Sequence, residues 1–187
     1  IDKANKIFVE ATKSRHKYDP ANFIPLRNFS GGVGEAFAAI LSDMSSDMIA
    51  NPHPDGYPDI LPNIDEIKPW IDSPTRKDFL LGGFDVKARY VGEGDKVDTN
   101  ASAHHNHTKS VFNVIWEWRD ASPFIIGITF MNNLTPSDWS ELKPAKEGSK
   151  STPACSLNGQ GKKKLRKNWL FLHESVLPRL SNKKDWL

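Results

Sequence analysis

The sequence predicts an α/β (α+β) domain in which helices flank a central mixed β-sheet. Two runs rich in β-branched and aromatic residues, 110–118 and 124–131, have the composition of strands. A third run, 80–91, is also mostly apolar, and an apolar stripe at helical spacing falls within 36–48. Strands interspersed with helices are typical of a layered domain with the sheet in the middle.

The remaining elements follow from local signals. In chain order we expect a helix (2–17), a helix (36–48), a strand near residue 59, three strands (80–91, 110–118, 124–131), a short helix from Pro136, and an apolar segment (165–172) that fits either a strand or a helix. The two strongest strands are expected to be joined through 119–123. A proline-punctuated insertion (62–74) and two polar stretches (92–109, 143–161) are expected to be irregular.

Length and charge bound the function. The chain has 187 residues, enough for a single domain that buries about 70% of its unfolded surface. Its net charge of +2 hides an asymmetry, because 143–187 holds 11 Lys or Arg against 3 acids, while the rest holds 14 against 20. A basic C-terminal segment suits phosphates, and an acidic remainder suits a cation.

The cellular setting is indicated by what the sequence lacks. A single cysteine, Cys155, excludes an internal disulfide and favours a reducing compartment. No secretory signal is visible, and the longest apolar run, 124–131, is too short to span a bilayer. We therefore expect a cytoplasmic protein with no membrane partner.

The triplet Asp85-Val86-Lys87 is the most informative motif. It places two opposite charges inside a predicted strand, which is costly unless they pair or hold a metal. Side chains two apart on a strand point the same way, so Asp85 and Lys87 share a face. The triplets 66–68 and 141–143 also fit an acid-x-Lys pattern, but a proline directly follows each and ends a central strand.

A second acid, Asp59, follows a proline and opens a short apolar stretch. Asp55 is a rival, but the glycine after it indicates a turn. Two carboxylates and a lysine suit Mg²⁺-dependent hydrolysis, because the acids ligate a hard cation and the lysine orients or activates water. The alternative is that Asp59 caps a turn and Asp85 simply pairs with Lys87.

A third acid, Glu35, precedes an amphipathic segment. The apolar residues of that segment recur at helical spacing: Phe37, Ile40, Leu41, Met44 and Met48. At about 100° per residue, Glu35 falls on the opposite side, in the expected first turn and beside glycines that permit close approach. We expect Glu35 to face the metal. The alternative is a favourable acid at a helix N-terminus.

The order Glu35, Pro58-Asp59 and Asp85-Val86-Lys87 resembles the PD-(D/E)XK nuclease superfamily, and most closely a type II restriction endonuclease. The resemblance covers roughly 30–130. It implies a restriction-endonuclease-like fold and a prokaryotic, Mg²⁺-dependent enzyme that cleaves double-stranded DNA. It also implies 5′-phosphate and 3′-hydroxyl ends, and a homodimer if the recognised sequence is palindromic.

The resemblance also implies roles for the site residues. Asp59, Asp85 and the Val86 carbonyl would ligate Mg²⁺, and Lys87 would position or deprotonate the attacking water. Glu35 would support a second metal or that water. A reading from a different class is a non-catalytic DNA-binding or structural module, in which the basic segment binds and the carboxylates are ordinary.

Two polar segments are predicted to contact DNA phosphate or base edges. They comprise His104, His105, Asn106 and His107, and then Lys162, Lys163, Lys164, Arg166 and Lys167, with Lys150 upstream. The histidines could instead hold zinc or form an ordinary surface loop. The basic run could instead be a solubilising face.

Overall fold

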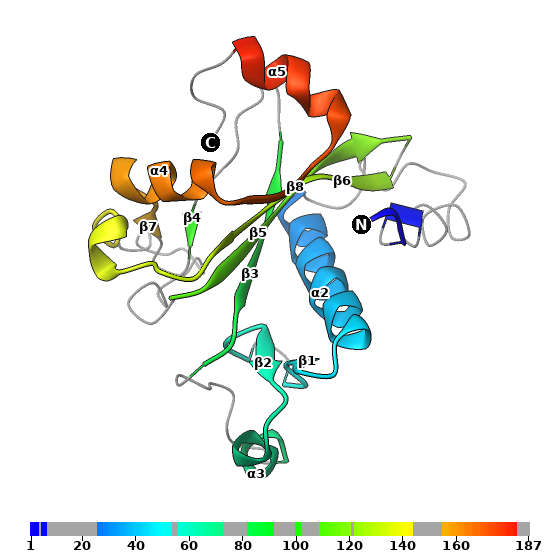
Figure 1. Cartoon of the computed structure of the whole chain (residues 1–187), viewed down its shortest axis with the longest axis vertical. Coiled ribbons are helices and arrows are strands. Elements are labelled where there is room, and N and C mark those ends of the chain that lie inside the picture. The colour runs from blue at the N-terminus through cyan, green and yellow to red at the C-terminus, as the bar shows by residue number, and fades with distance from the viewer. Residues whose placement is uncertain are drawn as a thin grey trace, which may run out of the picture.

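The computed structural model describes residues 1–3, 5–6, 26–53, 56–72, 82–91, 100–101, 109–120, 122–143 and 155–182. Its centre is a four-stranded sheet in the order β3–β5–β6–β8 (Figure 1). The strands are β3 (Asp85–Tyr90), β5 (Val111–Arg119), β6 (Ser122–Met131) and β8 (Trp169–Leu172). β3 runs parallel to β5 and the other pairs are antiparallel, which confirms the predicted mixed sheet.

The connection between β5 and β6 is shorter than predicted. Arg119 already pairs with Ser122, so β6 begins two residues before the expected start. Asp120 has φ 49°, in the left-handed region that aspartate tolerates in tight turns. The long apolar runs on both sides carry the pairing up to the turn.

Helix α2 (Leu26–Met44) begins earlier than predicted. The expected start lay at Glu35, after three glycines that are in fact helical. Phe29, Val33 and Phe37 continue the apolar stripe backwards at a spacing of four and pack against the sheet. This packing outweighs the helix propensity lost at each glycine, about 1 kcal/mol. Met44, predicted to belong to the stripe, is 70% exposed.

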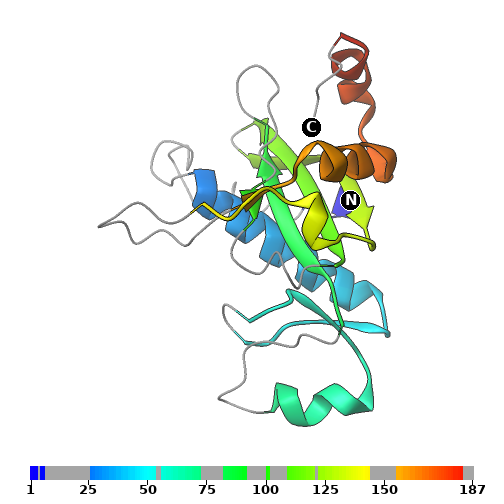
Figure 2. The same ribbon diagram turned by 90° about the vertical axis from the view of Figure 1, so that its left-hand side faces the viewer.

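The two faces of the sheet are covered by different helices. α2 packs against Val86 and Ala88, and a Cβ at Gly34 would lie 3.7 Å from the Val86 side chain. On the opposite face, α4 (Gly159–Lys167) contributes the buried Leu165 to a second apolar cluster (Figure 2). Residues 85, 87 and 89 alternate with 86 and 88, so the first set points away from α2.

A small appendage lies at one end of the sheet. β1 (Met48–Ala50) and β2 (Ile60–Pro62) pair antiparallel, and a 3-10 helix (Asp65–Ile67) with α3 (Lys68–Ile71) follows (Figure 1). Part of the insertion predicted to be irregular is thus helical. Its own apolar cluster centres on Leu61 and Ile67.

The C-terminal elements resolve one open prediction and correct another. The segment 165–172 contains the end of a helix, α4, and then a strand, β8. The two stretches predicted to be polar loops are partly paired, because β4 (Asn100–Ala101) is antiparallel to β7 (Cys155–Ser156). The expected helix from Pro136 is a 3-10 turn (Pro136–Asp138).

The chain ends complete the described structure. A 3-10 helix (Glu174–Val176) leads into α5 (Leu177–Asn182). Of the helix predicted for 2–17, residues 2–3 and 5–6 are helical, and the remainder lies outside the described residues. Within the described ranges, no helix is long and apolar enough to cross a membrane.

Candidate active site

The charges of the triplet meet at the beginning of β3. Lys87 Nζ donates a hydrogen bond to Asp85 Oδ1 at 2.7 Å, and the two form an ion pair. Asp85 is 2% exposed, whereas the Lys87 side chain keeps 23% of its surface in contact with solvent. A buried carboxylate thus lies beside an ammonium group that solvent can still reach.

Asp59 reaches this pair from the appendage. Ile60, the first residue of β2, exchanges two backbone hydrogen bonds with Phe84, at 3.0 and 2.8 Å. This bridge brings Asp59 beside the strand, where its Oδ2 accepts a hydrogen bond from the Val86 amide at 2.5 Å. The predicted convergence of Asp59 with the triplet is therefore seen in the structure.

Gly83 makes the close approach possible. It has φ +94°, which side chains rarely tolerate, and a Cβ there would lie 2.4 Å from the Ile60 carbonyl oxygen. The same Cβ would lie 2.6 Å from Pro58 Cγ. The sequence signal was a glycine inside a strand pattern, which is typical of a place where another backbone comes close.

Asn51 holds the Pro58–Asp59 segment from the other side. Its Nδ2 donates to the Pro58 carbonyl at 2.9 Å, and its backbone amide donates to the Asp59 carbonyl at 2.9 Å. Its Oδ1 accepts from the His53 amide at 3.0 Å. Sequence reasoning missed Asn51, since nothing in its local pattern indicates a partner seven residues away.

The electrostatics of the site are those of two crowded carboxylates. Burial, the charge of Asp85 and a hydrogen bond with Asp85 together raise the pKa of Asp59 to about 7. Lys87 and the Val86 amide act in the opposite direction, but they do not outweigh burial and repulsion. Near neutral pH, Asp59 is therefore half protonated.

The chemistry of these donors fits a divalent cation. Two carboxylates that repel each other become compatible when a cation lies between them. The N–H and C=O of one strand residue point to the same side, so the Val86 carbonyl faces the edge where its amide meets Asp59. Asp59, Asp85 and the Val86 carbonyl would together offer the oxygen ligands that Mg²⁺ prefers.

Glu35 does not join them in this structure. It is exposed, lies in the middle of α2, and makes no hydrogen bond or ion pair with any described residue. α2 covers the Val86 face of β3, while Asp85 and Lys87 point to the other face. Across the described residues, no three His, Cys, Asp or Glu side chains gather as a metal site, so the expected third acid stays apart.

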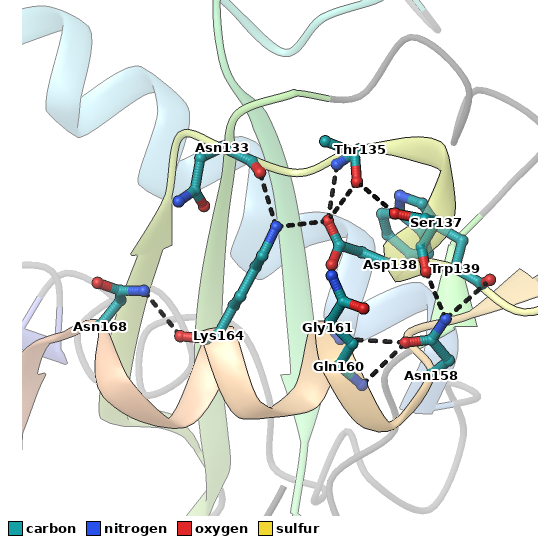
Figure 3. A network of polar contacts seen from close by, with 10 residues as sticks. All are labelled: Asn133, Thr135, Ser137, Asp138, Trp139, Asn158, Gln160, Gly161, Lys164 and Asn168. Atoms are coloured by element: carbon teal, nitrogen blue, oxygen red, sulfur yellow. Dashed lines mark hydrogen bonds and ion pairs between the residues drawn. The ribbon is translucent and has the colours of Figure 1, made fainter.

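The basic run forms α4, anchored by a polar network (Figure 3). Asn158 caps the helix by accepting from the amides of Gln160 and Gly161, at 2.9 and 3.1 Å. Lys164 Nζ donates to Asp138 Oδ2 at 2.7 Å and to the Asn133 carbonyl at 3.0 Å. Burial disfavours the charge on Asp138, but the bonds from Lys164 and Thr135 prevail and hold its pKa below the usual range.

Lys164 thus has a structural role, in contrast to its predicted DNA contact. Lys163 and Lys167 are exposed, and Lys162 and Arg166 are half-buried. Lys163 and Lys167, two residues either side of Leu165, fall on the opposite side of the helix from this buried residue, which fixes the helix on the sheet. The helix therefore presents positive charge outward.

α4 and the carboxylates share one end of the sheet. Val111 at the start of β5 pairs with Asp85 on one side and with Met131 on the other. Asn133, whose carbonyl accepts a hydrogen bond from Lys164, lies two residues after Met131. Strand spacing puts the carboxylates roughly 10 Å from the end of β6, on the face that α4 covers.

No protein-family model matches the chain, and no curated protein or solved structure is significantly similar to it. The candidate site is therefore defined by the positions of Asp59, Asp85 and Lys87 alone.

The remaining residues that were predicted to contact DNA are outside the described residues. They are His104, His105, Asn106, His107 and Lys150.

Lys109 was missed by sequence reasoning. Its side chain is exposed and its carbonyl accepts from the Leu134 amide at 3.0 Å, which places it at the same end of the sheet as α4.

Proposed function

We propose that this chain is a Mg²⁺-dependent endonuclease that hydrolyses phosphodiester bonds of double-stranded DNA, with a restriction-endonuclease-like fold. The supporting observation is the convergence of Asp59, Asp85 and Lys87 at the beginning of β3. An acid delivered by β2 next to an acid-x-Lys strand is the arrangement that the resemblance implies.

The chain's own groups supply positioning and charge. Asp59, Asp85 and the Val86 carbonyl would hold Mg²⁺, whose contribution is to polarise the phosphate and a bound water. The Lys87 ammonium, held in place by its ion pair with Asp85, orients the attacking water and stabilises charge on the phosphoryl oxygens. The water oxygen bonds to phosphorus as the bond to the 3′ oxygen breaks. The water loses one proton to solvent and the departing 3′ oxygen takes one proton from solvent, so the products are a 5′-phosphate and a 3′-hydroxyl.

Substrate binding would rely on α4. Its outward lysines suit phosphate contacts, which supply much of the affinity of DNA-binding proteins. The carboxylates lie roughly 10 Å from the end of β6, on the face that α4 covers, so one duplex could meet both α4 and the carboxylates. If the recognised sequence is palindromic, two copies would each cut one strand.

Cleavage assays test the proposal directly. Plasmid should be cut in Mg²⁺ and left intact in Ca²⁺ or EDTA. Asp85→Asn and Lys87→Ala should each reduce the cleavage rate at least about 100-fold, because the first removes a charged Mg²⁺ ligand and the second removes positive charge at the reacting phosphate. Binding to labelled duplex in Ca²⁺ should change little for Lys87→Ala.

The chain provides a matched control in the acid-x-Lys triplet 141–143. Glu141 and Lys143 are exposed and lie outside the four strands of the central sheet, so Glu141→Gln and Lys143→Ala should retain wild-type cleavage. Glu35→Gln tests whether Glu35 supports the metal, as the sequence predicts, or stays apart from it, as in the structure. If Glu35 is not a ligand, this variant should retain most of the cleavage activity. Duplex retardation without cleavage by the wild type in Mg²⁺ would favour the non-catalytic binding module instead.

A further inference from the structure

A row of three polar side chains crosses the sheet on the face opposite α2. Lys87 on β3 is the register partner of Asn113 on β5, which is in turn the partner of Thr129 on β6. Register partners lie about 5 Å apart and point to the same face. Val111 and Ile115 flank Asn113 on this face and belong to its apolar cluster, so the row interrupts an otherwise apolar surface.

The two inner members of the row are buried. Asn113 is 3% exposed and Thr129 is 0% exposed. Asn113 Nδ2 and Thr129 Oγ1 have no hydrogen-bond partner within the described part of the chain. Buried amide and hydroxyl groups are nearly always bonded to protein or to ordered water, because desolvating them unpaired is unfavourable. Two such groups side by side therefore indicate a site for water.

We propose that Asn113 and Thr129 hold an internal water that also hydrogen-bonds to Lys87 and keeps its ammonium against Asp85. The hydrogen bonds balance. The water accepts from Asn113 Nδ2 and from Lys87 Nζ, and it donates to Thr129 Oγ1. Lys87 has three N–H donors, and Asp85 Oδ1 takes one of them.

Asn113 and Thr129 are then positioning residues that act through Lys87. Their effect on cleavage rests on the proposed function, whereas the water site itself does not. An apolar pair at these positions would suit the surrounding apolar cluster, but it would leave Lys87 without a polar register partner on β5. The row thus accounts for polar residues in the middle of two strongly apolar strands.

Nuclear Overhauser effects between water and ¹⁵N-labelled protein test the site without DNA or metal. The Asn113 side-chain amide protons should show a cross-peak to a long-lived water. Thr129→Val should abolish this cross-peak, and Thr129→Ser, which keeps the hydroxyl, should retain it. A wild-type protein without the cross-peak, or a cross-peak that survives Thr129→Val, would overturn the proposal.

Melting temperature provides a second readout with a definite sign. Thr129→Val should lower it, because the valine breaks the hydrogen bond to the water. If the hydroxyl had no partner, the isosteric valine would raise the melting temperature, and this result would also overturn the proposal.

The link to Lys87 is tested by measuring kcat and KM for DNA cleavage separately. Thr129→Val should lower kcat roughly tenfold and leave KM for DNA unchanged, as expected for a group that orients another. Thr129→Ser should restore kcat. An unchanged kcat in Thr129→Val would refute the link to Lys87. A wild-type protein that does not cut DNA would contradict only the proposed function, and the cross-peak and melting temperature would still decide the water site.

Discussion

Asp59 Oδ2 and the Val86 amide are joined by a hydrogen bond of 2.5 Å across 27 residues of sequence. The carboxylate is therefore oriented by the backbone of β3. An asparagine at this place can accept the same hydrogen bond while carrying no charge. Geometry and charge at Asp59 can thus be separated by one substitution.

Asp59→Asn should stabilise the protein above neutral pH. The pKa of Asp59 is raised to about 7 in the folded protein, so the stability it contributes is present below about pH 4 and is lost as the pH rises towards 7. At pH 8 the variant should exceed the wild type by up to about 4 kcal/mol in free energy of unfolding, because the pKa of Asp59 rises from 3.8 to about 7. At pH 4 the difference should nearly vanish. Urea denaturation at both pH values measures it, and a gap independent of pH would contradict the assignment.

In the presence of Mg²⁺, the wild type should become more stable than Asp59→Asn. Mg²⁺ that binds the native state raises the free energy of unfolding with the logarithm of the Mg²⁺ concentration, and only the wild type has both carboxylates to bind it. Because Mg²⁺ displaces the proton held by Asp59, its affinity should rise as the pH rises through 7. Calorimetric titration at pH 6 and pH 8 tests both statements. Equal Mg²⁺ affinity in Asp59→Asn and wild type would exclude Asp59 as a ligand.

Gly83→Ala should damage both fold and site. The substitution forces a Cβ to within 2.4 Å of the Ile60 oxygen at a φ of +94°, so β2 must move away from β3. We expect a loss of about 1–3 kcal/mol in stability and a weaker Mg²⁺ affinity. Gly32→Ala is the matched control, because a Cβ there meets nothing within 4 Å inside a helix. That variant should be more stable by about 0.5–1 kcal/mol.

The lysines of α4 should divide into two classes. Replacing Lys163 and Lys167 by glutamine should weaken binding to all DNA sequences about equally and lower the slope of log K against log salt by up to about 2. Folding stability should change little, since both side chains are exposed. An unaltered salt slope in this double variant would identify α4 as a solvated face.

Lys164→Met should behave in the opposite way. It leaves the buried Asp138 carboxylate without its cation, so stability should fall by about 2–4 kcal/mol. The salt slope of DNA binding should stay close to that of the wild type in the folded protein. A change in the salt slope without a change in unfolding free energy would mean that Lys164 contacts phosphate.

The parts of the fold that sequence predicted best are those with strong local patterning. β5 and β6 are long, β-branched and aromatic, and their positions were predicted to within two residues. The shared face of Asp85 and Lys87 also follows from strand geometry alone. Only the resemblance to a nuclease family suggested that Asp59 lies near Val86, because no local sequence rule connects residues so far apart.

What sequence did not predict depends on tertiary contacts. The start of α2 was displaced because glycine propensity is weak compared with the packing of Val33 and Phe37 on the sheet. Glu35 consequently lost its expected place at a helix N-terminus. Asn51 acts through backbone atoms of a segment that only the folded appendage brings near, and Asn113 is polar for a reason visible only in the register of three strands.

The two carboxylates come from different elements, although the β1–β2 hairpin also packs against the sheet cluster through Ile60. Asp59 adjoins the appendage, whose small apolar cluster of Leu61 and Ile67 is distinct from the clusters on the sheet, and Asp85 belongs to the sheet itself. A cation held by both would act as a reversible cross-link between them. Loss of the cation would let the β1–β2 hairpin open locally while the sheet stays folded, and amide hydrogen exchange at Ile49 and Leu61 would accelerate well before exchange in β5.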